Sequence, residues 1–417
     1  MIRLIETLGF RCLKYVSQPL GDFHVLVGPN ASGKTTFLDI IAFMGKLVSD
    51  GLEEALNERT PDFRDLVWQR RDGCFELALE LGIPLGKREL LEKKTFNVVR
   101  YEISVGLDQN TKAVSLLAEK VLLKEQVPAP PLSRQLALFP VERPAPETLI
   151  TPKGTRHTKT VVNKVIDGND NFYDETGKGW DHSFKLGPRK SAFGNLPEDK
   201  SKFPVATWLK GILREGIQAI MLNSALMCKP SPPAQPRGFR PDGSNLPWVV
   251  EFLKNNHPER HREWLNHLQT ALPDLEDIRT IERKEDRHRY LVVDYQNNIK
   301  VPSWMISDGT LRLLALTLPA YLPDLEGIYL IEEPENGIHP RAVETMFQSL
   351  SSVYGAQMLM ATHSPVILSA AQASQVLCFS KTEKGAADIV LGSKHPALRD
   401  WKGEENLGVL FAGGVLG

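Results

Sequence analysis

The pattern of apolar and polar positions along the chain predicts an α/β fold. Short apolar or alternating runs predict β-strands, and longer runs with apolar residues three or four positions apart predict helices. The expected strands span residues 2–10, 23–27, 74–81, 98–105, 219–222, 327–333 and 357–361. The expected helices span residues 33–47, 206–220, 248–253, 263–272, 308–314 and 341–354. The helix at 33–47 is expected to pack on the sheet that contains the strand at 23–27.

Two parts of this pattern concern the N-terminal third of the chain. The strands at 2–10 and 23–27 are separated by a turn-prone stretch around Pro19, which suits an edge hairpin. The run at 113–121 fits either a helix or a strand, and both interpretations stay open.

Proline and charge then mark a change in the character of the chain. Residues 127–152 contain too many prolines for a continuous helix. Residues 153–202 carry ten Lys or Arg against seven Asp or Glu, with a hairpin turn at 167–169. We therefore expect an irregular β-rich or helical insertion, and a division of the chain into an N-terminal part at 1–115, the insertion at 116–205, a lobe at 206–300 and a C-terminal part at 301–417.

The composition is that of an ordinary globular protein, with a formal net charge of −1 over 417 residues. A nucleic-acid contact would therefore need a local patch. Residues 153–202 suit DNA or a partner protein, because aromatic side chains lie between their charges; a solvated hairpin surface is the alternative. The four cysteines match neither a C-x-x-C pair nor a zinc spacing. No signal peptide, membrane span or long coiled coil is recognisable, which predicts a cytoplasmic protein.

A phosphate-binding loop follows the strand at 23–27. It reads Gly-Pro-Asn-Ala-Ser-Gly-Lys-Thr-Thr, the G-x-x-x-x-G-K-[ST] pattern, in which glycines let backbone N–H groups turn toward a phosphate chain. Lys34 is expected to reach the terminal phosphates and Thr35 to bind Mg²⁺. The expected nucleotide-binding residues are Gly28, Pro29, Asn30, Ala31, Ser32, Gly33, Lys34, Thr35 and Thr36.

Four side chains outside the loop are weaker candidates. Arg11, Lys14 and Tyr15 either lie beside the bound nucleotide or form an exposed part of a hairpin. Gln69 is a weak candidate for touching the metal or the attacking water, because a single glutamine has many other roles.

The C-terminal part of the chain supplies further candidates. Ser307-Asp308-Gly309 opens a helix and either binds an anion or acts as a simple helix cap. Glu332 and Glu333 end a buried strand, where the first would orient Mg²⁺ and the second would polarise the attacking water. His363 ends the next strand and could bind the γ-phosphate or that water.

Together these segments resemble the ABC-type ATPases of the SMC, RecF and OLD group, in particular the stand-alone AAA-family ATPases of bacterial genome maintenance and phage defence. The resemblance implies a P-loop ATPase head with a mixed sheet flanked by helices, an antiparallel β lobe, and ATP and Mg²⁺ as cofactors. It rests on likenesses to Walker A at 28–36, the ABC signature at 307–310, Walker B at 328–333, the D-loop at 335–340 and the switch-histidine loop at 362–365.

The resemblance also implies a mechanism and partners. Ser307 and Gly309 of one protomer would close over ATP held by Lys34 of another, in an ATP-dependent homodimer. Hydrolysis would then drive a motor or sensor in DNA maintenance or antiphage defence. Because the residues after Pro365 are too few for the Toprim nuclease domain of OLD proteins, we expect a separate effector protein.

Two departures from the family pattern keep alternatives open. Glu332 stands where Walker B usually has aspartate, so a nucleotide-gated scaffold with little turnover is one alternative. The signature reads Ser-Asp-Gly-Thr rather than Ser-Gly-Gly-Gln, and it lies far from Thr36, which disfavours a transporter ATP-binding subunit. The apolar C-terminus at 407–417 either docks a partner or packs on the core.

Overall fold

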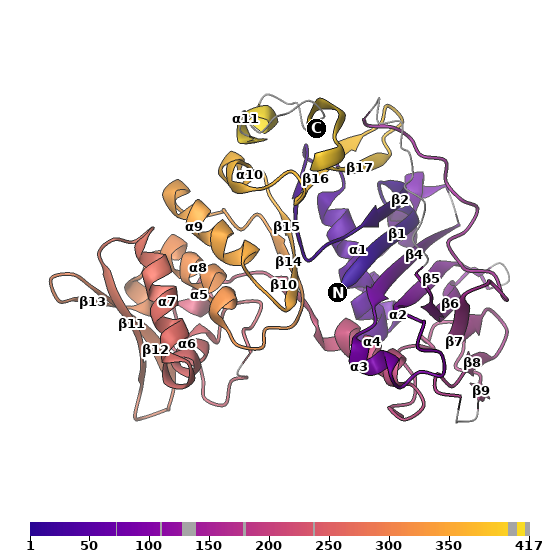
Figure 1. Ribbon diagram of the computed structural model, residues 1–417, viewed down its shortest axis with the longest axis horizontal. Helices are drawn as coiled ribbons and strands as arrows, with labels where there is room; N and C mark the ends of the chain where they lie inside the picture. The colour runs from indigo at the N-terminus through magenta and orange to yellow at the C-terminus, as the bar shows by residue number, and fades with distance from the viewer. Residues whose placement is uncertain are drawn as a thin grey trace.

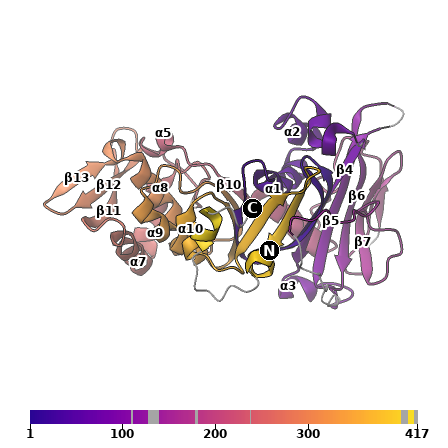
Figure 2. The same cartoon turned by 90° about the horizontal axis from the view of Figure 1, so that it is seen from above.

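The computed structural model describes residues 1–71, 73–108, 111–126, 139–177, 181–236, 238–398 and 407–412. Three parts lie in a row: an antiparallel β lobe, a central six-stranded sheet, and a helical lobe that carries a small three-stranded sheet (Figures 1 and 2). This α/β architecture is the expected ATPase-head arrangement.

The central sheet has the strand order β10-β14-β15-β3-β16-β17, and only β17 runs antiparallel to its neighbour. Strand β3 has apolar side chains on both faces: Val25 and Val27 belong to one apolar core, whereas Leu26 belongs to the other. Both faces of the sheet are therefore covered, as in most parallel sheets. The strands are β3 (Phe23–Val27), β10 (Ile217–Ile220), β14 (Gly327–Glu332), β15 (Ala356–Ala361), β16 (Val376–Lys381) and β17 (Ala387–Leu391).

The β lobe is an eight-stranded antiparallel sheet. The expected hairpin between the strands at 2–10 and 23–27 is wrong, because β1 pairs with an unexpected strand, β2, and with β4, while β3 lies in the central sheet. Polar residues interrupt the apolar pattern of β2, which buries only Leu13, Val16 and Gln18. The strands are, in spatial order, β2 (Leu13–Pro19), β1 (Ile2–Phe10), β4 (Cys74–Gly82), β5 (Val98–Leu107), β6 (Val114–Lys124), β7 (Thr158–Val165), β8 (Asp170–Phe172) and β9 (His182–Phe184).

The segment at 113–121, open between helix and strand, is strand β6. Because β6 runs through residues 115 and 116, the β-sheet continues across the expected start of the insertion. The domain division itself stays a prediction. A further segment, residues 139–152, which we call the strap, crosses the outer face of the sheet and binds β17, where Arg143 pairs with Asp388 at 3.2 Å. The first part of the proline-rich stretch lies outside the described residues.

Helix α1 (Lys34–Ser49) follows the phosphate loop and lies between the two large sheets, where it contacts β4 and β15 (Figure 1). Helix α4 (Pro204–Glu215) packs beside it. The remaining helices are α2 (Leu52–Asn57), α3 (Leu85–Arg88), α5 (Ser224–Met227), α6 (Leu246–Asn256), α7 (Pro258–Gln269), α8 (Asp308–Thr317), α9 (Pro340–Ser351), α10 (Pro365–Ala370) and α11 (Leu407–Ala412).

The helical lobe covers the other face of the central sheet, with α8 and α9 next to it and α6 and α7 beyond (Figure 1). The small sheet of this lobe contains β11 (Leu275–Glu282), β12 (Arg289–Tyr295) and β13 (Ile299–Pro302). At the C-terminus, α11 contacts α10, and Leu407 is buried in the core. The start of this segment therefore packs on the rest of the protein, and residues 413–417 lie outside the described residues. Among the helices of the described ranges, none is long and apolar enough to cross a membrane.

Candidate functional site

The phosphate loop has the glycines that its backbone requires. Gly28 and Gly33 adopt φ angles of 148° and 105°, which other residues rarely adopt. A Cβ atom on Gly28 would lie 2.2 Å from the carbonyl oxygen of Phe379 on β16. Glycine is therefore needed at this position both for the turn and for the close approach of the neighbouring strand.

Lys34 is the central cation of the loop. Its Nζ donates hydrogen bonds to the carbonyl oxygens of Gly28 at 2.8 Å and Pro29 at 3.0 Å. Burial lowers the pKa of this ammonium group, and Glu333 and Glu332 partly oppose that effect. Ser32 is also buried, and its hydroxyl group has no partner within the described chain. A buried lysine and an unpaired hydroxyl group in a glycine-rich loop at the start of α1 fit a phosphate chain.

Thr35 and Glu332 meet at the first turn of α1. The Thr35 hydroxyl donates a hydrogen bond of 2.5 Å to Oε2 of Glu332, which ends strand β14. Both oxygen atoms are hard ligands of the kind that Mg²⁺ prefers. Two of the three residues named as metal ligands from the sequence, Thr35 and Glu332, thus lie side by side, and their chemistry fits the ion.

Glu333 is held in an uncommon backbone conformation, with φ of 47°. Its backbone N–H donates to the carbonyl oxygen of Ala361 on β15 at 2.8 Å, and its Oε2 accepts a hydrogen bond from Nδ2 of Asn336 at 2.6 Å. Such strain at a functional position is common where the surroundings fix one side-chain direction. The carboxylate is oriented by the residues that follow it in the chain.

His363 follows β15 and is positioned by Glu335. Oε1 of Glu335 accepts hydrogen bonds from the hydroxyl group of Thr362 at 2.6 Å and from the backbone N–H of His363 at 3.0 Å. The D-loop acid and the histidine loop therefore form one unit. The sequence alone did not indicate this link, because the two segments lie apart along the chain.

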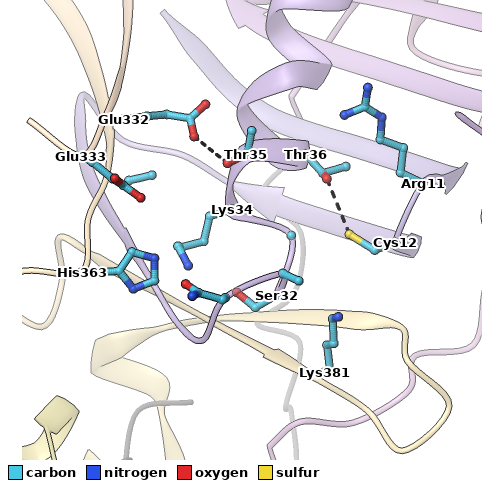
Figure 3. Close-up of a pocket in the computed structure, with 14 residues that line it drawn as sticks. Arg11, Cys12, Ser32, Lys34, Thr35, Thr36, Glu332, Glu333, His363 and Lys381 are labelled. Atoms are coloured by element: carbon cyan, nitrogen blue, oxygen red, sulfur yellow. Dashed lines mark hydrogen bonds between the residues drawn. The ribbon is translucent and has the colours of Figure 1, made fainter. Parts of the chain in front are cut away.

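A cavity of about 420 Å³ unites these parts (Figure 3). Figure 3 shows Glu332, Glu333 and His363 on one side of Lys34, and Arg11, Cys12 and Lys381 on the other. The expected residues that line the cavity are Arg11, Asn30, Ala31, Ser32, Gly33, Lys34, Thr35, Thr36, Glu332, Glu333 and His363. Sequence reasoning missed Cys12, in the turn between β1 and β2, and Lys381, at the end of β16. Neither belongs to a motif, and both reach the cavity only through tertiary packing around the loop.

The other candidates near the N-terminus lie elsewhere. Lys14 pairs with Glu142 of the strap and does not line the cavity. Gln69 lines a neighbouring hollow with Arg11 and Asp65 and does not line the cavity that contains Thr35 and Glu332. Its role as a metal ligand is therefore not supported by its position and stays a weak prediction.

The signature-like residues do not line the nucleotide cavity. The Ser307 hydroxyl accepts a hydrogen bond from the backbone N–H of Thr310 at 3.2 Å and thus caps α8. A Cβ atom on Gly309 would lie 2.2 Å from the carbonyl oxygen of Gly337, so the start of α8 packs tightly on the D-loop. Within one protomer, Ser307 and Gly309 therefore stand apart from the loop that would hold the phosphates.

The fold and the phosphate loop define the class of this protein, a P-loop domain of the AAA kind. The chain belongs to the family described as "AAA domain, putative AbiEii toxin, Type IV TA system", whose model matches residues 23–75 and 173–369. No curated protein sequence matches the chain significantly.

Two solved SMC heads share the fold. An SMC head bound to the C-winged helix domain of ScpA is 14% identical with a TM-score of 0.52, over 93% of this chain and 96% of the other. An SMC head with an extended coiled coil bound to the C-terminal domain of ScpA, derived from Pyrococcus furiosus, is 13% identical with a TM-score of 0.50, over 93% and 95%. At these identities the likeness establishes the fold alone.

Proposed function

We propose that this protein binds ATP with Mg²⁺ and hydrolyses it. The observation that carries the proposal is the direct contact between Thr35 and Glu332, in a cavity that also contains Lys34, Glu333 and His363. Loop N–H groups and Lys34 hold the phosphates, while Thr35 and Glu332 hold Mg²⁺, which neutralises charge on the phosphates. Glu333 polarises the attacking water, and His363 hydrogen-bonds the γ-phosphate.

The test compares ATP hydrolysis by the wild type and by Glu333→Gln, which keeps the side-chain size and removes the basic oxygen. We expect the rate to fall by about 10²-fold or more, in line with the loss of a general base. Binding of ATP should remain, because Lys34 and the loop are unchanged. Equal rates in both proteins would overturn the enzymatic proposal.

We infer further that two copies form the complete site. Ser307 and Gly309 are exposed or half-buried at the start of α8 and lie outside the cavity of their own protomer, which supports a role against a second copy. Sedimentation of Glu333→Gln with and without ATP and Mg²⁺ tests this. We expect Glu333→Gln to form a dimer only with ATP. The double variant that also carries Lys34→Ala should stay monomeric under the same conditions. A persistent monomer at saturating ATP would contradict the dimer.

The cellular role that we propose is that of a motor or sensor in DNA maintenance or antiphage defence, acting in the cytoplasm with a separate effector protein. The family description names a toxin of a toxin–antitoxin system, and the solved SMC heads are bound to ScpA, which supports a partner protein here. DNA would contact the basic residues at 153–202. Co-purification from the native host with and without nuclease identifies the effector protein and the nucleic acid. An association that does not weaken as the salt concentration rises would contradict a contact with the phosphate backbone.

A nucleotide-gated scaffold with little turnover is the second candidate. It is favoured by Glu332, which is one methylene longer than the usual aspartate and reaches the Thr35 hydroxyl directly. If ATP causes dimerisation while hydrolysis stays equal in the wild type and Glu333→Gln, the scaffold replaces the enzyme. The distance along the chain between Thr36 and Ser307 keeps a transporter subunit the least favoured option.

A further inference from the structure

A second hollow lies on the outer face of the β lobe and shares no lining residue with the nucleotide cavity. Its volume is about 650 Å³, which is within the range of roughly 300–1,000 Å³ that is typical of small-molecule sites. The strands that build it, β6, β7 and β8, lie at the end of the molecule opposite the helical lobe (Figure 1). We call this feature the outer hollow.

The floor of the outer hollow is a polar row across three strands. Lys120 on β6 is paired in register with Asn163 on β7, and Asn163 is paired with Asn171 on β8. Residues paired in this way project from the same face of a sheet. The neighbouring positions Val162 and Phe172 are buried in the apolar core, so the polar row faces outward.

Lys153 stands at the rim, just after the strap. The strap is fixed on the sheet there, because the backbone N–H of Thr151 donates to Oε1 of Glu102 at 2.6 Å and its hydroxyl group donates to Oε2 at 2.9 Å. Over the described ranges, no hydrogen-bond or ion-pair partner is found for the ammonium group of Lys153. The fixed backbone at Thr151 thus keeps Lys153 near the hollow, and the ammonium group of Lys153 is available for a ligand.

The side wall offers a ring and further polar groups. Tyr173 follows β8 and lines the hollow, and neither its hydroxyl group nor the amide of Asn163 has a partner among the described residues. Lys159 also lines the wall, where it pairs with Glu92 at 2.7 Å. The wall therefore combines an aromatic face, an unpaired amide and positive charge.

Two acids also line the hollow, but local backbone contacts engage both. Oδ1 of Asp174 accepts hydrogen bonds from the backbone N–H of Thr176 at 2.9 Å and from its hydroxyl group at 3.0 Å. Oδ1 of Asp181 accepts one from the backbone N–H of Asp174 at 3.3 Å. These contacts stabilise the turn. Of the three lysines in the lining, Lys159 is paired with Glu92 and Lys120 donates to the carbonyl oxygen of Thr151, so Lys153 carries the positive charge that is left for a ligand.

We propose that the outer hollow binds a nucleoside phosphate, either as a free mononucleotide or as one unit of a single strand of nucleic acid. The Tyr173 ring stacks on the base, the amides of Asn163 and Asn171 pair with its polar edge, and Lys153 binds the phosphate. This site lies outside the ATP cavity and goes beyond the proposed ATPase activity. For a single strand of nucleic acid, it gives the proposed DNA contact at 153–202 a defined place.

The test uses Lys34→Ala as background, so that binding at the phosphate loop does not hide the second site. Two probes are titrated by calorimetry or fluorescence anisotropy: AMP and a short labelled oligothymidylate. We expect at least one to bind, and Lys153→Ala with Asn163→Ala to weaken that binding by about 10-fold or more. Binding of AMP indicates a free nucleotide as the source, and binding of the oligonucleotide alone indicates a strand.

The matched control is Gln296→Ala with Lys300→Ala, which removes one amide and one charge at exposed positions in the helical lobe. It should bind the probes like the Lys34→Ala background. Tyr173→Phe should also bind normally, whereas Tyr173→Leu should bind weakly, because only the former keeps the ring. Absence of binding by both probes, or equal affinity in the hollow variant and the control, overturns the proposal. Hydrolysis of ATP by the hollow variant with Lys34 intact should match the wild type, so the two proposals fail independently.

Discussion

Glu335 holds the backbone N–H of His363 through a hydrogen bond of 3.0 Å, and the same oxygen accepts the Thr362 hydroxyl group. Replacing Glu335 by alanine removes both bonds and frees the histidine loop. We expect kcat to fall by about 10-fold with little change in KM for ATP, because the loss concerns positioning and not ground-state binding. Steady-state ATPase assays measure both constants.

Glu335→Gln is the matched control for that variant, because its carbonyl oxygen can still accept both hydrogen bonds. It should retain most of kcat. A rise in KM without a fall in kcat for Glu335→Ala would show that this acid acts on ATP binding and not on His363.

The contact between Thr35 and Glu332 leads to a prediction about magnesium. Glu332→Gln keeps the hydrogen bond to Thr35 but removes the negative charge, so we expect the Mg²⁺ concentration for half-maximal hydrolysis to rise by about 10-fold. Glu332→Asp keeps the charge and should stay closer to the wild type. Measuring the ATPase rate as a function of Mg²⁺ concentration distinguishes the two variants. An unchanged Mg²⁺ concentration for half-maximal hydrolysis in Glu332→Gln would show that Glu332 does not bind the metal.

The positions of the site residues could be predicted from the sequence where these residues lie close together in a motif. Residues 28–36 require a fixed local conformation, and Glu332 and Glu333 simply end a buried strand, so their positions follow from local pattern. The same holds for most central strands, whose apolar runs are continuous.

Other features depend on tertiary packing and leave little local pattern. Strand β2 alternates poorly, and its partner β1 had been expected beside β3. Lys381 enters the cavity because β16 packs against Gly28, a contact between residues far apart in the chain. The contact between Gly309 and Gly337 is likewise non-local, and no spacing rule indicates it.

Cys12 provides a direct readout of nucleotide binding. Its thiol lies 3.6 Å from the Thr36 hydroxyl group and lines the cavity. We expect maleimide labelling of Cys12 to slow by about 10-fold or more at saturating ATP and Mg²⁺, because a bound ligand blocks access. Mass spectrometry of the labelled peptides measures the rate.

Cys378 serves as the internal control for this labelling, because burial raises the pKa of its thiol to about 12 and the residue is inaccessible. It should react little with or without ATP. In Lys34→Ala, ATP should not slow the labelling of Cys12. The same result in the wild type would mean that the nucleotide binds elsewhere.

Gly309→Ala tests the packing of the signature segment on the D-loop. The added Cβ atom would lie 2.2 Å from the carbonyl oxygen of Gly337, so α8 or the D-loop must shift. We expect loss of ATP-dependent dimerisation and a fall in hydrolysis of about 10-fold or more, with ATP binding by the monomer retained. Gly211→Ala on α4 is the control, because no atom lies within 4 Å of its added Cβ. Normal ATP-dependent dimerisation of Gly309→Ala would show that the contact between Gly309 and Gly337 is not required for dimer formation.

Glu175 makes the stability of the protein depend on pH. It is fully buried and caps α4, where its two oxygens accept hydrogen bonds from the backbone N–H groups of Val205 at 2.7 Å and Ala206 at 2.8 Å. Burial raises its pKa from 4.5 to about 7. The folded protein therefore binds an additional proton between these two pH values, and the free energy of unfolding falls as the pH rises through that interval, by up to about 3 kcal/mol.

Glu175→Gln isolates this contribution, because the amide is uncharged at every pH and keeps the shape of the side chain. Urea denaturation at about pH 5 and about pH 7.5 gives the free energy of unfolding of both proteins. We expect the wild type to lose stability relative to Glu175→Gln at the higher pH, since only the wild type must then bury a charge or take up a proton. A difference between the two proteins that does not change with pH would mean that Glu175 stays ionised throughout, with the two N–H groups and the start of α4 sufficient to stabilise the carboxylate.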